Sequence, residues 1–198
     1  MHLADLDMNK IYSYADYYQW NFAERIELIR GKIFRMAPAP NRFHQKSTLT
    51  IGRLIGNYLQ NKSCEVYTAP FDVRFPRKSK QDQDIYTVLQ PDVCVICDPS
   101  KLDMKGCIGA PDIVVEVLSP GNAEKEMKFK FNVYEEAGVK EYWIVSLINQ
   151  YVTINLLKDN KFVIQPSLFP GDIITTPILP GLQLEVAELF KGMDHMNE

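Results

Sequence analysis

Apolar residues recur at helical spacing in two parts of the chain, and each is predicted to be a helix with one buried face. The first helix runs from about Gln45 to Asn61. The second begins at Asn122, a good N-cap residue, and runs to about Ala137, where Gly138 is a typical C-terminal cap. Shorter helices are expected at Ser13–Trp20 and Leu182–Phe190.

Runs rich in Val, Ile, Tyr and Phe, bounded by turn residues, predict the strands. In chain order these are a hairpin at Glu24–Met36 that turns at Gly31, then Glu65–Ala69, Phe71–Phe75, Asp92–Cys97, Asp112–Leu118, Glu141–Leu147, and a second hairpin of Tyr151–Leu157 and Phe162–Gln165. The strand, helix and strand from Asp112 to Leu147 are typical of a βαβ crossover. The pattern predicts an α/β (α+β) protein: a mixed β-sheet flanked by helices, with β-hairpins in its N- and C-terminal parts.

Length and composition narrow the class of protein further. The 198 residues are enough for one domain, residues 1–198, and few for two. The formal net charge of -3 differs from the basic surface typical of nucleic-acid-binding proteins, so any such site must be local or rely on a bound cation. No segment resembles a signal peptide or is apolar enough to span a bilayer, so we expect no membrane contact and a cytoplasmic location.

The four cysteines are Cys64, Cys94, Cys97 and Cys107. Cys94 and Cys97 have CxxC spacing, but they fall in a predicted strand, where residues three apart point to opposite faces. A zinc site would need a second such pair and matching His residues, which the sequence lacks. We therefore interpret the cysteines as buried reduced thiols that pack as small apolar side chains.

One acidic residue stands inside the most apolar predicted strand. Glu116 shares a strand face with Val114 and Leu118. A strand that is apolar on both faces usually lies at the centre of an α/β sheet, where an isolated carboxylate is costly. Glu116 therefore needs a partner: a Lys or Arg, a set of hydrogen bonds, or a metal ion. A structural ion pair and a functional site both satisfy this need.

Two further charged residues could accompany Glu116. Asp92 opens a predicted strand; alone it is typical of a solvated strand end, but two carboxylates on neighbouring strands can hold Mg²⁺. Lys130 shares the apolar face of the second helix with Tyr134 and so points toward the sheet. It could snorkel at the edge of that face, or place its ammonium beside Glu116 to orient or help deprotonate a water.

Five other residues are weaker candidates. Glu27 alternates with apolar neighbours in a hairpin, a pattern typical of a solvent-facing side chain. His44 precedes a predicted helix, as a cap or surface residue often does. Arg74, Arg77 and Lys78 belong to a basic run that could follow a phosphate backbone, although charge runs in loops are usually only solvated.

These residues together resemble the PD-(D/E)XK nuclease superfamily and, more closely, its Uma-two-type group of restriction-endonuclease-like proteins. The resemblance covers nearly the whole chain, and it is carried by Gln90-Pro91-Asp92-Val93, by Val115–Pro120, by Tyr134 with Ala137–Trp143, and by similar segments at Glu27–Lys32, Met36–Pro38 with His44, and Leu179–Leu182. One position departs from the superfamily: its usual lysine two residues after the glutamate is Leu118 here. The corresponding lysine of the group matches Lys130, the residue that the helical face also selects.

The resemblance implies a restriction-endonuclease-like fold and an enzyme that hydrolyses DNA phosphodiester bonds with one or two Mg²⁺ or Mn²⁺ ions. It implies that Asp92 and Glu116 hold the metal and that Lys130 aligns the water or the scissile phosphate. Glu27 and His44 would complete the site. A homodimer is also implied, because cutting both strands of DNA takes two sites.

Two other interpretations stay open. The chain could be a nuclease-fold protein without activity that binds nucleic acid or a partner, which its acidic pI of about 5.7 favours. It could also be a structural protein in which Glu116 and Lys130 form a buried ion pair. Metal binding and DNA cleavage separate the three interpretations.

Overall fold

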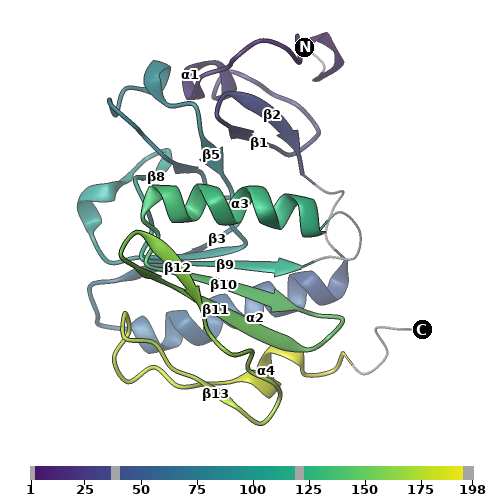
Figure 1. The fold of residues 1–198 in the computed structure, drawn as a ribbon, viewed down its shortest axis with the longest axis vertical. Coiled ribbons are helices and arrows are strands. Elements are labelled where there is room, and N and C mark those ends of the chain that lie inside the picture. Colours follow the sequence, from purple (N-terminus) through teal and green to yellow (C-terminus); the bar gives the residue numbers. More distant parts are fainter. Residues whose placement is uncertain (1–2, 37–40, 119–122, 194–198) are drawn as a thin grey trace.

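A six-stranded mixed sheet forms the centre of the molecule in the computed structural model, which describes residues 3–36, 41–118 and 123–193 (Figure 1). Its strand order is β12 (Lys161–Ile164), β11 (Tyr151–Lys158), β10 (Glu141–Ser146), β9 (Ile113–Leu118), β6 (Val93–Ile96) and β3 (Glu65–Thr68). Helix α3 (Ala123–Ala137) covers one face, and helix α2 (Arg42–Leu59) covers the other. The central strands β6, β9 and β10 are therefore buried on both faces.

A second six-stranded sheet packs on the far side of α3. Its order is β2 (Lys32–Arg35), β1 (Ile26–Ile29), β5 (Val88–Leu89), β4 (Val73–Arg74), β8 (Gly106–Ile108) and β7 (Leu102–Asp103). Val73 and Leu89 of this sheet share one hydrophobic cluster with Tyr134 of α3 and Val114 of β9. The helix therefore lies between the two sheets and can place side chains toward both.

The predicted fold class is confirmed. Strands β9 and β10 are parallel and are joined by α3, as the βαβ pattern predicts, and a hairpin stands at each end of the chain. The remaining described elements are α1 (Tyr14–Tyr17), β13 (Ile173–Ile174), β14 (Leu184–Glu185), α4 (Val186–Phe190) and three 3₁₀ turns at Leu3–Asp5, Asp82–Asp84 and Pro99–Lys101. Within the described residues, no helix is both long and apolar enough to cross a membrane.

Helix boundaries differ from the prediction where capping side chains act. Helix α2 starts three residues early because the Asn41 side chain accepts hydrogen bonds from the backbone N–H groups of Phe43 and His44. Helix α1 is shorter than predicted but has the expected capping box between Ser13 and Asp16. The expected N-cap Asn122 lies outside the described residues.

The first hairpin turns at the predicted glycine. Arg30 and Gly31 have φ angles of 52° and 77°, as a tight two-residue turn requires. A Cβ added at Gly31 would stand 2.4 Å from a side-chain carbon of Ile11, so both the conformation and the space select glycine. The turn fixes the register that pairs Glu27 with Phe34.

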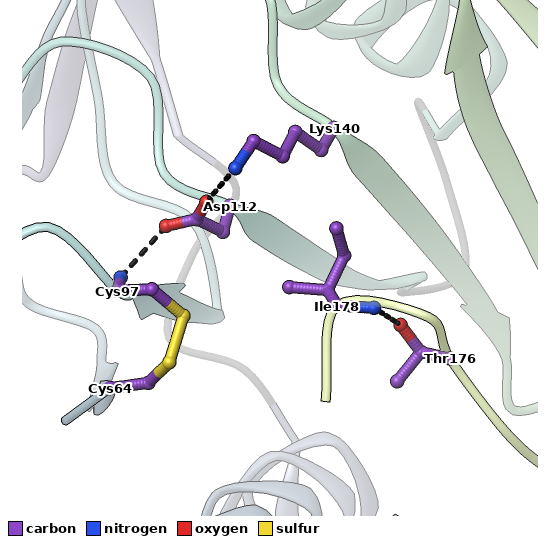
Figure 2. The surroundings of a disulfide bond; sticks show 6 residues. All are labelled: Cys64, Cys97, Asp112, Lys140, Thr176 and Ile178. Carbon is purple, nitrogen blue, oxygen red and sulfur yellow. Dashed lines mark hydrogen bonds and ion pairs between the residues drawn. A yellow bond between two sulfur atoms is a disulfide. The ribbon is translucent and has the colours of Figure 1, made fainter. Parts of the chain in front are cut away.

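The interpretation of all four cysteines as reduced thiols is wrong for one pair. Cys64 and Cys97 form a disulfide (Figure 2). The antiparallel register of β3 and β6 pairs Glu65 with Ile96, so the residues just beyond each strand meet. Cys94 and Cys107 are free and buried, as expected, and burial raises the pKa of the Cys107 thiol to about 11.

Asp112 lies beside the disulfide (Figure 2). Its place at the start of a strand suggests a solvated side chain, but the residue is buried. Its Oδ2 accepts a hydrogen bond of 2.7 Å from the backbone N–H of Cys97, and its Oδ1 lies 2.6 Å from Nζ of Lys140. The Asp112 carboxylate thus ties the end of β6 to the start of β10. This contact lies at the opposite end of β6 from Asp92.

Candidate functional site

The two carboxylates predicted to act together lie on adjacent strands. Strands β6 and β9 are antiparallel neighbours, with Val93 paired to Val115. Continuing that register by one residue brings Asp92 opposite Glu116, on the same face of the sheet. The backbone N–H of Val117 donates a hydrogen bond of 2.7 Å to Oδ2 of Asp92, which fixes the carboxylate at the junction of the strands.

Lys130 of α3 reaches down onto this junction, as its place on the helical face predicts. Its Nζ lies 3.1 Å from Oε1 of Glu116 and 3.1 Å from Oε1 of Glu27. The lysine is 4% exposed, whereas Lys128 on the same helix is exposed. One ammonium therefore bridges carboxylates from two different sheets, because α3 lies between them.

Tyr134 is a member of the site that the sequence pattern assigned only to the apolar face. Its hydroxyl donates a hydrogen bond of 2.6 Å to Oε1 of Glu116. Tyr134 stands four residues after Lys130, so the two side chains lie on the same face of α3. This i, i+4 spacing from Lys130 is the sequence signal that could have identified Tyr134 as a member of the site. Burial, together with the facing Glu116 carboxylate, holds the pKa of Tyr134 well above its usual value, so the hydroxyl keeps its proton.

The charge balance of this group favours protonation of Glu116. Burial is the largest cause that raises the pKa of Glu116, to about 8, and the carboxylates of Asp92 and Glu27 add to it. Lys130 and the Tyr134 hydroxyl act in the opposite direction. When Glu116 is ionised, the carboxylates of Asp92, Glu116 and Glu27 outnumber the one ammonium, and a bound cation would offset the difference.

His44 contacts the second carboxylate. Its Nε2 lies 3.2 Å from Oδ2 of Asp92, so this nitrogen faces the acid as a donor. Its Nδ1 is buried and has no hydrogen-bond partner among the described residues. The capped first turn of α2 sets the position of the ring. His44 is thus buried on the Asp92 side of the site and is not a surface residue; its role in the site stays a prediction.

Glu27 is buried, which corrects the solvent-facing position that its alternating pattern suggests. It is 2% exposed, because β1 is covered on both faces. The backbone N–H of Gln90 donates a hydrogen bond of 2.8 Å to Oε1 of Glu27, the atom that also faces Lys130. The segment that leads into Asp92 therefore helps to hold Glu27 in place.

The basic run divides into a structural and an exposed part. Arg74 is 1% exposed; its guanidinium donates to the Cys107 carbonyl and forms ion pairs with Asp82 and Asp103. This burial does not fit the expected contact with a phosphate backbone: Arg74 lies in β4, inside the second sheet, where its charge is already paired. Arg77 is exposed and lies 3.2 Å from Glu136, and Lys78 is exposed.

The donor set suits a hard divalent cation held by two carboxylates. Among the described residues, the contacts of each carboxylate fall on one oxygen, Oδ2 of Asp92 and Oε1 of Glu116, which leaves the second oxygen of each to a ligand. No group of three or more His, Cys, Asp or Glu side chains within the described ranges is arranged as a complete metal site. Mg²⁺ commonly binds one or two carboxylates and completes its shell with water and substrate phosphate. Asp92 and Glu116 fit that mode.

Comparison with known structures and sequences assigns the fold and the family. A crystal structure from Anabaena variabilis, described as a putative nuclease belonging to DUF820, matches with a TM-score of 0.70 at 18% identity, over 90% of this chain and 97% of that one. The fold is therefore that of a nuclease-like α+β protein. The chain belongs to the Uma2 family, whose description is "Putative restriction endonuclease" and whose model matches residues 14–187.

One curated relative is the uncharacterized protein slr1290 of Synechocystis. It is 28% identical over 134 residues, and the match spans 66% of this chain and 66% of that protein. The aligned part is thus just under two thirds of the relative's length.

Proposed function

We propose that this protein is a metal-dependent endonuclease that hydrolyses phosphodiester bonds of DNA. The observation that carries the proposal is the position of Lys130, whose ammonium lies 3.1 Å from both Glu27 and Glu116. Glu116 in turn lies across the β6–β9 pair from Asp92. Paired carboxylates beside a buried lysine form a site for a cation, a water and a phosphate.

Asp92 and Glu116 would hold Mg²⁺ or Mn²⁺ through the oxygens that the protein leaves uncommitted. When bound, the cation supplies a water of lowered pKa and offsets the negative charge that develops on the phosphate. The residues of the chain prepare this site without it: Val117 and His44 orient Asp92, and Tyr134 orients Glu116.

Lys130 is the residue of the site best placed to act on water or phosphate. It is fixed by two carboxylates, and its ammonium charge can align a water or attract a phosphate oxygen. Glu27 anchors the far side of the lysine and is itself held by the Gln90 backbone. Its proposed role is to position Lys130.

The partner is DNA, in keeping with the family description, and the exposed Arg77 and Lys78 are its proposed phosphate contacts. A homodimer and a cytoplasmic location stay predictions. The Cys64–Cys97 disulfide bears on the location, because such bonds are rare in a reducing cytoplasm.

The test is cleavage of supercoiled plasmid with Mg²⁺ or Mn²⁺ by the wild type, Glu116→Gln and Lys130→Met. Lys128→Met is the matched control, because it removes an exposed lysine two positions away on the same helix. Metal-dependent nicking by wild type and control, lost in the other two variants while their circular dichroism is unchanged, supports the proposal. Absence of cleavage with either metal contradicts it and favours a nuclease-fold binding module, a role that the net charge of -3 leaves open.

A further inference from the structure

A cavity of about 460 Å³ opens beside the candidate site. We call it the aromatic pocket, because Tyr17, Tyr18, Trp20 and Phe22 line it. Its volume falls within the roughly 300–1,000 Å³ range of small-molecule sites. These four aromatic residues come from α1 and the segment that leads into β1, which contribute no side chain to the site described above.

Two hydrogen bonds join the wall of this pocket to the site. Gln90 lines the pocket, and its backbone N–H donates to Oε1 of Glu27 at 2.8 Å. Ala69 also lines the pocket, and its backbone N–H donates to the carbonyl of Asp92 at 3.1 Å. Gln45, a third wall residue, directly follows the histidine of the site in α2. Only this wall therefore separates a ligand in the pocket from Glu27 and Asp92.

The rings offer surfaces for stacking. The centroids of Trp20 and Phe22 are 5.5 Å apart and the rings are tilted by 38°, and Tyr18 is 57% exposed. Trp20 and Phe22 are partly exposed, and exposed aromatic rings near a site proposed to cleave phosphodiesters can serve as platforms for nucleobases. The bases of an intact duplex cover one another's faces, so only an unpaired or extruded base can use such a platform.

The polar groups of the pocket match the edges of a base. Arg25 donates a hydrogen bond of 3.0 Å to Oε1 of Gln90, and Nε2 of Gln90 donates to the Tyr17 hydroxyl at 3.2 Å, which fixes that wall. Glu24 and Gln45 add a carboxylate and an amide. Such side chains pair with the amino and carbonyl groups of bases.

We propose that the aromatic pocket binds one unpaired nucleobase adjacent to the bond that is cut, so that the substrate class is single-stranded or locally unpaired nucleic acid. The inference rests on the proposed nuclease function, because it uses the pocket's contact with Glu27 and Asp92. It adds to that function a preference between forms of nucleic acid.

The first test is binding of labelled oligonucleotides in EDTA, which separates binding from cleavage. The probes are a fully paired 20-base-pair duplex, the same duplex with one extra unpaired thymidine, and the single strand. We expect the two unpaired probes to bind roughly 5- to 100-fold more tightly, the range that base stacking on an aromatic ring supports. Phe22→Leu should remove the preference, and Phe169→Leu should keep it, because Phe169 is 51% exposed in the distant segment before β13.

The second test uses the two tryptophans. Trp143 is fully buried and donates a hydrogen bond to Glu141, so a ligand-dependent change in fluorescence reports on Trp20. We expect quenching by the single strand, and its loss in Trp20→Leu. Equal binding of all probes, no binding of any probe, or unchanged fluorescence would overturn the inference.

The two proposals can fail separately. Plasmid cleavage without a preference for unpaired probes would support the nuclease function and contradict the proposal that the aromatic pocket binds a base. A preference that depends on Phe22, without cleavage under either metal, would retain the pocket and remove the nuclease function.

Discussion

The ammonium of Lys130 lies 3.1 Å from Oε1 of Glu116, although the two residues are on different elements, 14 positions apart in the chain. The pair is buried, and Glu27 stands at the same distance on the other side of the lysine. Lys130 forms ion pairs with both carboxylates, so one side chain offsets negative charge from two sheets.

Replacing Lys130 with methionine should lower the free energy of unfolding by about 3–5 kcal/mol, because two carboxylates then stay buried without their cation. The double variant Lys130→Met with Glu116→Gln should recover part of the loss, since one of those charges is gone. Urea unfolding at pH 9, above the pKa of Glu116 so that both carboxylates are ionised, measures both. A single variant as stable as the wild type would show that water already screens these groups.

Stability should depend on pH through Glu116. Burial raises the folded-state pKa to about 8 from an ordinary value of 4.5, so the folded protein holds the proton more tightly. The stabilisation is complete below about pH 4.5 and is lost as the pH rises through about 8. Each unit of difference is worth about 1.4 kcal/mol. Urea titrations at several pH values should show this decline in the wild type and a flatter profile in Glu116→Gln; parallel profiles would contradict it.

Two substitutions of Asp92 should separate its structural and chemical roles. Asp92→Asn keeps an oxygen to accept from the Val117 N–H, so the fold should be retained while metal-dependent cleavage is lost. Asp92→Ala leaves that N–H without its acceptor and should cost about 1–3 kcal/mol more than Asp92→Asn. Thermal unfolding and plasmid nicking measure the two effects. Full cleavage by Asp92→Asn would exclude a metal-binding role for this carboxylate.

Because Cys64 and Cys97 are joined in a disulfide, the unreduced protein should contain two free thiols. Cys94 and Cys107 should react with a maleimide after denaturation, and Cys64 and Cys97 should react only after reduction by a dithiol. Replacing both Cys64 and Cys97 with serine should lower stability by about 2–4 kcal/mol, since the bond closes a loop of 33 residues. Four reactive thiols in protein purified without reductant would show that the bond does not form.

Arg74 and Arg77 should behave differently despite belonging to the same basic run. Arg74→Met should destabilise the protein by about 1–3 kcal/mol, because the Cys107 carbonyl loses its donor and the partly exposed Asp82 and Asp103 lose an ion-pair partner. Arg77→Ala should change stability by less than about 0.5 kcal/mol and should weaken DNA binding more at low salt than at high salt. An unchanged salt dependence would remove Arg77 from the DNA-binding surface.

The sequence predicts the parts of this structure that depend on local periodicity. Lys130 follows from the face of a helix, and Glu116 follows from its place in an apolar strand. Glu27 does not, because its burial comes from α3 packing on the second sheet, which no local pattern contains. The resemblance to a family supplied Glu27 and His44 instead.

Long-range pairing explains the other differences. The Cys64–Cys97 bond depends on the register of β3 and β6, which the local sequence does not show. The CxxC spacing pairs Cys97 with Cys94, which is not its partner. Arg74 looks like its basic neighbours in sequence, yet β4 lies in the interior of its sheet and turns the side chain inward.

The bridging position of α3 makes the site depend on the docking of two sheets. Glu27 belongs to one sheet and Glu116 to the other, and Lys130 meets both only after the two sheets have docked on the helix. A chain that has formed the local β9–α3–β10 unit but not the contact with β1 lacks half of this arrangement. The arrangement of Lys130 between Glu27 and Glu116 therefore requires both sheets, and a molecule with only one of them folded carries the residues without the site.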